Sequence, residues 1–247
     1  MSERFSSCDF HLTPGFCDPT SIPKLPRLVS ALISLLPTDV SLRRPLTHLA
    51  PNLLELDLLH TSLTSDMLPD DVSDRSWEFI NGLNLGQQFR SKVEAFTNDK
   101  SRTWMRDQGV IPKAVACLPF VQSFWIKCGH RGLISIAISP RPLITKQGNW
   151  AMGISHKLDG SLSTGQFLNI CHYPANKKLA ADEVVSTTGA GDTVSGSLVA
   201  GLSVITAPDG SNSSQKSDGM EQADVESFVK AAMERAERSI RSRRAVG

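Results

Sequence analysis

Apolar positions in the first part of the chain predict a strand, a helix and a second strand, in that order. Residues 15–17 resemble the end of a strand, and residues 24–36 carry apolar side chains at mixed spacings of three and four. That spacing is typical of an amphipathic helix, which Pro37 ends. Residues 46–50, Leu-Thr-His-Leu-Ala, then precede Pro51, and this segment predicts the second strand.

The remaining pattern continues to alternate between helical and extended spacing. Residues 73–96 are near helical spacing but contain two glycines, which predicts one broken helix or two. Residues 98–108 are polar and predict a loop or a helix end. The other predicted elements are a short helix at 110–118, strands at 123–127, 133–138 and 166–173, a loop with at most one strand at 139–165, a mobile insertion at 203–218 and a helix at 223–243. Such alternation favours an α/β protein.

Residues 184–193 concentrate the candidate chemistry. Val184-Val185 suit the end of a strand, and apolar positions from Thr193 to Leu202 predict a helix. The intervening Gly189-Ala190-Gly191 lets the backbone approach a ligand, and amides at a helix N-terminus favour an anion such as phosphate. Asp192 is itself negative, so it is a candidate general base for an attacking hydroxyl. The alternative is that Asp192 only caps the helix.

Composition narrows the class of function. The 247 residues suit one sizeable core, and 26 Lys and Arg against 25 Asp and Glu give a net charge of +1. No broad field is therefore expected to hold a nucleic acid or an acidic membrane. Five cysteines without a C-x-x-C pair, and the lack of a leader-like or membrane-spanning apolar run, predict a cytoplasmic protein without a disulfide framework.

The string Thr188-Gly189-Ala190-Gly191-Asp192-Thr193, followed by Gly196 and an apolar helix, resembles the C-terminal signature of the PfkB (ribokinase-like) carbohydrate and nucleoside kinases. Asn52 and Glu55 alone are read as a capping box, but they are also similar to the Asn-x-x-Glu motif of the same family. Lys127-x-Gly129-x-x-Gly132 is a glycine-containing hairpin by itself, and it is similar to the nucleotide-side hairpin of these kinases.

Two further segments resemble one branch of that family. Residues 18–24 and 47–56 look like the corresponding parts of pseudouridine kinases, including kinases fused to a pseudouridine-5′-phosphate glycosidase. The resemblance implies a ribokinase-like three-layer α/β/α fold with a mostly parallel sheet. It also implies ATP and Mg²⁺ as cofactors and a small nucleoside or sugar, most simply pseudouridine, as the acceptor.

The resemblance also assigns roles to individual residues. Gly189, Ala190 and Gly191 would hold the developing negative charge, and Asp192 would take the proton of the acceptor hydroxyl. Asn52 and Glu55 would organise Mg²⁺, whose ligands are usually oxygen atoms. The residues assigned to the nucleotide are Thr188, Lys127, Gly129 and Gly132. A solvent-exposed role for Lys127 is equally compatible with the sequence.

One part of the family pattern has no counterpart in the sequence. Residues 1–17 are expected to be an irregular segment, and residues 18–247 the nucleotide-binding portion of a PfkB-like domain that lacks the acceptor-binding strands and the lid. Loss of those strands would uncover apolar edges and faces of the sheet, and an oligomer, a partner chain or an incomplete gene model would each resolve this. The expected macromolecular partners are a second copy of the chain, in a homo-oligomer, or a fused or separate glycosidase domain. The alternative function is a non-catalytic nucleotide-binding remnant or interaction module.

Overall fold

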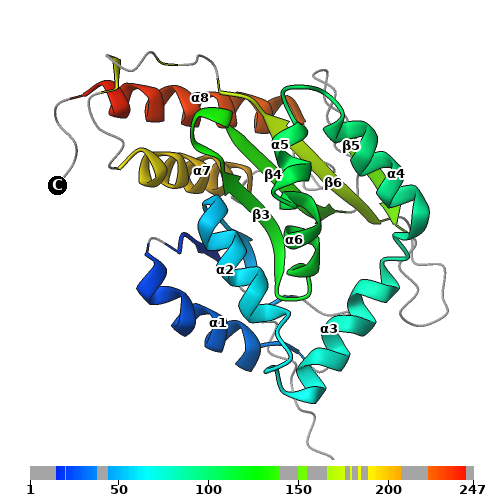
Figure 1. Cartoon of the computed structure of the whole chain (residues 1–247). Coiled ribbons are helices and arrows are strands. Elements are labelled where there is room, and N and C mark those ends of the chain that lie inside the picture. Colours follow the sequence, from blue (N-terminus) through cyan, green and yellow to red (C-terminus); the bar gives the residue numbers. More distant parts are fainter. Residues whose placement is uncertain are drawn as a thin grey trace, which may run out of the picture.

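A six-stranded sheet forms the centre of the protein (Figure 1). The computed structural model describes residues 15–19, 21–37, 44–139, 150–154, 166–175, 179, 183–184, 189–206 and 222–242. The sheet order is β1-β2-β3-β4-β6-β5. The strands are β1 (Phe16–Cys17), β2 (Leu46–Leu49), β3 (Val121–Lys127), β4 (Leu133–Ser139), β5 (Trp150–Ile154) and β6 (Gln166–Tyr173).

Strand direction divides the sheet into two halves. The pairs β1–β2 and β2–β3 are parallel, whereas β3–β4, β4–β6 and β5–β6 are antiparallel. The sheet is therefore mixed, and the prediction of a mostly parallel sheet is wrong. The physical reason is that residues 128–132 turn the chain directly from β3 into β4, and a short turn can join only antiparallel neighbours.

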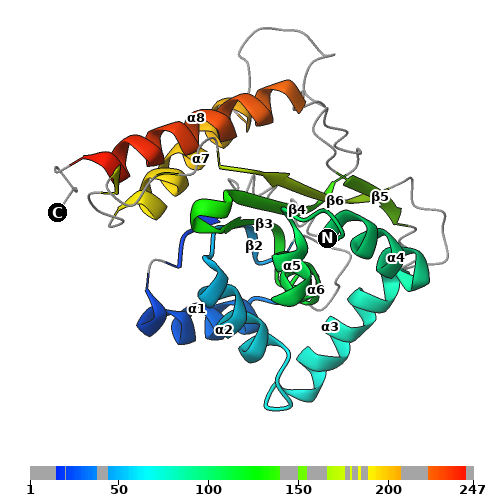
Figure 2. The same ribbon diagram turned by 45° about the horizontal axis from the view of Figure 1, so that its top comes forward.

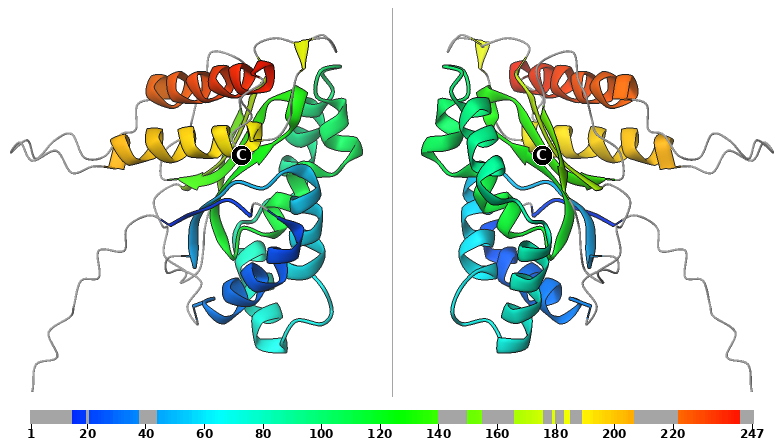
Figure 3. Two further views of the ribbon diagram at one scale, coloured as in Figure 1. Left: turned by 90° about the vertical axis from the view of Figure 1, so that its left-hand side faces the viewer. Right: turned by 90° about the vertical axis from the view of Figure 1, so that its right-hand side faces the viewer.

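Helices cover both faces of the sheet, which confirms the predicted α/β class. Figures 2 and 3 show helices packed against both faces of the sheet. The first face carries α7 (Ala190–Thr206) and α8 (Gln222–Arg241). The second carries α1 (Leu25–Ser34), α2 (Leu53–Leu63), α3 (Asp70–Gly82), α4 (Gly86–Thr97), α5 (Thr103–Asp107) and α6 (Val110–Ala116), with a 3-10 helix at Ile22–Lys24 leading into α1.

The alternating side chains of the strands supply a separate core to each face. On β3, Phe124 and Ile126 belong to the cluster beneath α1–α6, whereas Trp125 packs in the cluster beneath α7 and α8. The second cluster also contains Leu198 of α7 and Val229 of α8. Because successive side chains of a strand point to opposite faces, this central strand anchors both helical layers.

The structure decides between some predicted alternatives and corrects other boundaries. The pattern at 73–96 belongs to two helices, α3 and α4, which confirms one of the two alternatives; residues 83–85 separate them, and Asn84 there has a φ of 46°. The polar stretch 98–108 contains the short helix α5. Val184 is not in a strand, and residues 185–188 lie outside the described residues. Ser203–Thr206 belong to α7, and the rest of the predicted insertion, through residue 218, lies outside the described part of the chain.

His48 on β2 predicts a loss of stability in mild acid. Burial lowers the pKa of His48 to about 4, and its Nδ1 has no hydrogen-bond partner among the described residues. The unfolded state therefore binds the extra proton first, so stability should fall as the pH drops from the ordinary histidine value of about 6.5 toward 4. We expect a loss on the order of 2–3 kcal/mol across this interval.

Urea unfolding at pH 7 and pH 5 checks this expectation. His48→Gln should reduce the loss in the free energy of unfolding between pH 7 and pH 5. The substitution His130→Gln, at an exposed histidine, should leave this loss as it is in the parent. Some pH dependence should remain in His48→Gln, because burial also lowers the pKa values of His60 and His172. The prediction would be contradicted if the parent and His48→Gln lost the same free energy of unfolding between pH 7 and pH 5.

Candidate functional site

The N-terminus of α7 begins at the glycine-rich turn singled out by the sequence. Gly189 has a φ of 80°, a conformation that favours glycine. The amide and the hydroxyl of Thr193 both donate to the carbonyl oxygen of Gly189, each at 2.9 Å. The amides of Ala190, Gly191 and Asp192 precede this first helical bond, so they are the N–H groups that a helix leaves available for an anion.

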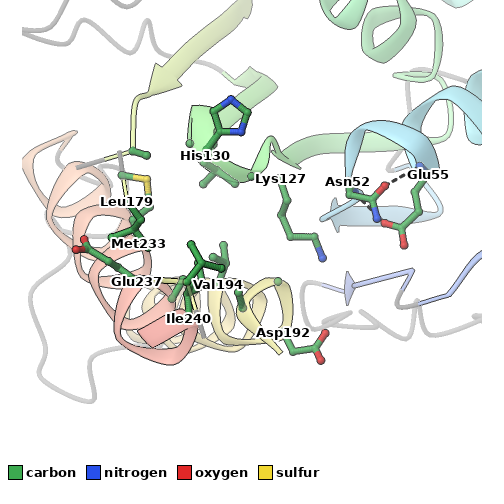
Figure 4. Close-up of a pocket in the computed structure, with 18 residues that line it drawn as sticks. Asn52, Glu55, Lys127, His130, Leu179, Asp192, Val194, Met233, Glu237 and Ile240 are labelled. Atoms are coloured by element: carbon green, nitrogen blue, oxygen red, sulfur yellow. Dashed lines mark hydrogen bonds between the residues drawn. The ribbon is translucent and has the colours of Figure 1, made fainter. Parts of the chain in front are cut away.

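Asp192 lies in the first turn of α7, and its side chain is exposed. Figure 4 shows its carboxylate at the edge of a cavity, at the same end as the side chain of Lys127. This position leaves the carboxylate accessible to a substrate that enters from solvent.

Asn52 and Glu55 form the capping box expected from their spacing. The backbone amide of Asn52 donates to Glu55 Oε2 at 2.8 Å, and the amide of Glu55 donates to Asn52 Oδ1 at 2.9 Å. This reciprocal arrangement satisfies two amides at the start of α2. It also fixes the carboxylate of Glu55, which is only 4 % exposed.

Burial and several nearby groups shift the pKa of Glu55. Burial is the main cause that raises the pKa of Glu55, and the nearby carboxylates of Asp18 and Asp192 raise this pKa further. The hydrogen bond from the Asn52 amide and the charge of Lys127 oppose this effect. One lysine therefore lies within electrostatic reach of a group of acidic side chains.

Lys127, the last residue of β3, points toward the N-terminus of α7. Its backbone amide donates to Pro51 O at 2.8 Å, which ties the end of β3 to the start of α2. Its ammonium is 2.7 Å from both carboxylate oxygens of Asp18 and 3.3 Å from Ser195 Oγ. A methyl group added at Gly191 would lie 3.8 Å from Lys127 Nζ, so the ammonium passes beside the first turn of α7.

The two glycines of the β3–β4 turn occupy different environments. Gly129 has a φ of 58° and open space where a Cβ would be. Gly132 has a φ of 94°, and a Cβ there would be 2.0 Å from the carbonyl oxygen of Tyr173. Gly132 is therefore required by the close passage of the β6 backbone, which the sequence pattern did not indicate.

These elements surround a cavity of about 600 Å³. Figure 4 shows one end, the polar end, with Asn52, Glu55, Lys127 and Asp192, and an opposite end where apolar side chains of α7 and α8 lie with Glu237 of α8. The lining residues are Asn52, Glu55, Lys127, Gly129, His130, Gly132, Leu133, Ala175, Leu179, Val184, Ala190, Gly191, Asp192, Val194, Met233, Ala236, Glu237 and Ile240. Its walls thus come from α2, the β3–β4 turn, α7 and α8.

The cavity brings together most of the site residues predicted from the sequence. Gly189 adjoins it as the residue before α7, and Thr188 lies outside the described residues. Sequence reasoning gave no role to Asp18 or Ser195, although Asp18 lies in a segment used for the resemblance. It interpreted Met233 and Ile240 only as core positions of the C-terminal helix, because apolar periodicity does not distinguish a core from a cavity wall.

The oxygen atoms at the polar end of the cavity are the candidate ligands of a cation. Among the described residues, no group of three or more His, Cys, Asp or Glu side chains is arranged to hold a metal ion. Mg²⁺ commonly uses only one or two carboxylates and completes its shell with water and phosphate oxygens. The buried carboxylate of Glu55, with the side-chain oxygen of Asn52 beside it, fits that smaller requirement, because it is an oxygen donor in an acidic surrounding.

Part of the chain is similar to a curated protein sequence. The chain is 27 % identical over 186 residues to a pseudouridine-metabolizing bifunctional protein of Schizosaccharomyces pombe. The match covers 75 % of this chain and 22 % of the relative, so the chain spans about a fifth of that protein's length. No family model matches the chain.

Among solved structures, the chain was compared with a protein from Clostridium perfringens presumed to be a sugar kinase. The TM-score is 0.37 with 12 % identity, over 94 % of this chain and 49 % of the other. Superposition at this level does not establish a shared fold. Within the described part of the chain, no helix is both long and apolar enough to cross a membrane.

Proposed function

We propose that this chain is an ATP-dependent phosphotransferase that acts on the hydroxyl group of a small nucleoside or sugar, with pseudouridine as the first candidate acceptor. The observation that carries the proposal is the first turn of α7, where amides that precede the first helical hydrogen bond, an accessible carboxylate and the ammonium of Lys127 meet at one cavity. Positive groups and a base within one small space are what phosphoryl transfer requires.

Each group at the polar end has a chemical task in this proposal. The amides of Ala190 and Gly191 would donate to the terminal phosphate oxygens, where the helix dipole favours negative charge. Lys127 would add a full positive charge beside them. Asp192 would accept the proton of the acceptor hydroxyl, and its exposed position leaves room for the acceptor to approach.

Asn52 and Glu55 are the residues proposed to organise Mg²⁺, and the capping box fixes the Glu55 carboxylate for this task. When bound, the cation would neutralise phosphate charge. Glu55 supports this assignment because its carboxylate is buried beside two other acids, and a cation there would offset their repulsion. Gly129 and Gly132 line the same cavity and are proposed to pass close to the nucleotide.

The choice of acceptor rests on the relative. Its name describes pseudouridine metabolism and two functions, and the match spans only part of it. The proposed activity of this chain is therefore the addition of phosphate to pseudouridine, giving pseudouridine 5′-phosphate.

A second candidate is nucleotide binding without transfer. The exposure of Asp192 favours it, because a base open to water does not by itself hold an acceptor in line or exclude hydrolysis.

Incubation of the purified chain with MgATP and pseudouridine, with uridine and ribose as alternative acceptors, tests both candidates. The kinase proposal expects a phosphorylated acceptor in the mass spectrum and an equal amount of ADP. Calorimetric binding of ATP without any phosphorylated acceptor would instead support the second candidate. A chain that neither binds nor uses ATP would overturn both.

A further inference from the structure

Asp18 and Lys127 form an ion pair between distant parts of the chain. They are 109 positions apart, yet both carboxylate oxygens of Asp18 lie 2.7 Å from Lys127 Nζ. Their side chains are 12 % and 13 % exposed, so the pair is largely shielded from water. Asp18 directly follows β1, and Lys127 ends β3, so the pair lies where two strands of the sheet end.

Ser195 extends this pair to α7. Its hydroxyl is buried and 3.3 Å from Lys127 Nζ, so the ammonium has three oxygen neighbours from two different elements. A lysine ammonium has three donors on a flexible stem, and three acceptors fix where its charge lies. The same stem passes Gly191, in the first turn of α7.

We propose that Asp18 is a positioning residue, which holds the ammonium of Lys127 beside the first turn of α7 so that the charge meets a bound nucleotide's terminal phosphate. This inference rests on the proposed nucleotide site. Asp18 does not touch the nucleotide in this arrangement and acts only through Lys127, with Ser195 as a second, weaker support.

This arrangement has a specific consequence for binding and turnover. Asp18 is an acid beside the phosphate site and competes with phosphate for the same ammonium. Its removal should therefore leave nucleotide binding unchanged or stronger, because like-charge repulsion is lost. Turnover should fall, because the ammonium is no longer held in one place. Loss of Lys127 should instead weaken both, because the cation itself is removed.

The test compares Asp18→Asn with Lys127→Gln by calorimetric ATP binding and steady-state transfer. For Asp18→Asn we expect kcat to fall about tenfold and the Kd of ATP to stay equal or to tighten up to about threefold. For Lys127→Gln we expect the Kd to weaken about tenfold or more. The double variant should have a kcat no lower than that of Lys127→Gln alone, because the two residues act as one unit.

Further variants separate positioning from folding. Asp18→Glu keeps the charge and should recover part of kcat, and Ser195→Ala should lower kcat about twofold to threefold. These two variants decide the matter if Asp18→Asn fails to fold in a thermal melt. The matched control is Asp57→Asn, which removes an aspartate–lysine pair of 2.6 Å with Lys113 on the surface of α2 and should change neither kcat nor Kd.

The outcomes distinguish this inference from the proposed function. If Asp18→Asn and Lys127→Gln weaken ATP binding alike, or if Asp18→Asn keeps full turnover, the positioning role is overturned while the kinase proposal stands. If the parent binds ATP but transfers nothing, the kinase proposal falls, and the opposite Kd changes still decide the role of Asp18. A parent that binds no ATP overturns both.

Discussion

Asp192→Asn should lower phosphoryl transfer by a factor of about 10²–10⁴ while nucleotide binding persists. The substitution keeps the size and the hydrogen-bonding shape of the side chain but removes its ability to accept the proton of the acceptor hydroxyl. Binding should persist because the amides of the first turn of α7 and the ammonium of Lys127 are unchanged. Removing one negative charge near the phosphates should, if anything, strengthen ATP binding.

The measurement is kcat with saturating MgATP and acceptor, together with calorimetric binding of ATP to the same preparation. Asp70→Asn is the matched control, because Asp70 is also an exposed aspartate in the first turn of a helix, α3, away from the cavity. Its kcat should equal that of the parent. Equal turnover in Asp192→Asn and the parent would show that Asp192 is not the base and would leave it only a favourable charge in the first turn of α7.

Local sequence signals predicted both helices that begin at the site, although α7 begins at Ala190 and not at the predicted Thr193. The capping box of Asn52 and Glu55 depends only on residues three positions apart, and both of its hydrogen bonds are present. The turn before α7 could be predicted because its glycines are followed by a helical apolar pattern. The structure shows that Gly189 in this turn has a positive φ. The roles of these residues toward ATP and Mg²⁺ stay predictions.

Contacts between residues distant in the sequence, and the direction of some strands, could not be predicted in the same way. The pairing of Asp18 with Lys127 depends on how β1 and β3 are placed through β2, and no local pattern encodes that placement. Lys127 was equally compatible with an exposed side chain until the fold placed an acid beside it. The antiparallel half of the sheet was missed for a different reason: the resemblance supplied a mostly parallel sheet, while the short turn at 128–132 already favoured a hairpin.

Gly132→Ala, in the β3–β4 turn, should destabilise the fold severely. A Cβ at position 132 would lie 2.0 Å from Tyr173 O, 2.7 Å from Ala175 N and 2.8 Å from Pro174 C. All three atoms belong to backbone, so relief requires the β3–β4 turn to separate from the end of β6. We expect a loss of about 4 kcal/mol or more in the free energy of unfolding, together with weaker ATP binding because this turn lines the cavity.

Gly129→Ala separates that steric cause from the cost of backbone conformation. Gly129 also has a positive φ, but no atom lies within 4 Å of the point that a Cβ would occupy, so only the left-handed strain of about 1–2 kcal/mol should apply. Urea unfolding of both variants at pH 7 measures the difference. If the two glycines cost the same, the clash with the β6 backbone does not determine the stability of the turn, and the need for Gly132 lies in its φ of 94° alone.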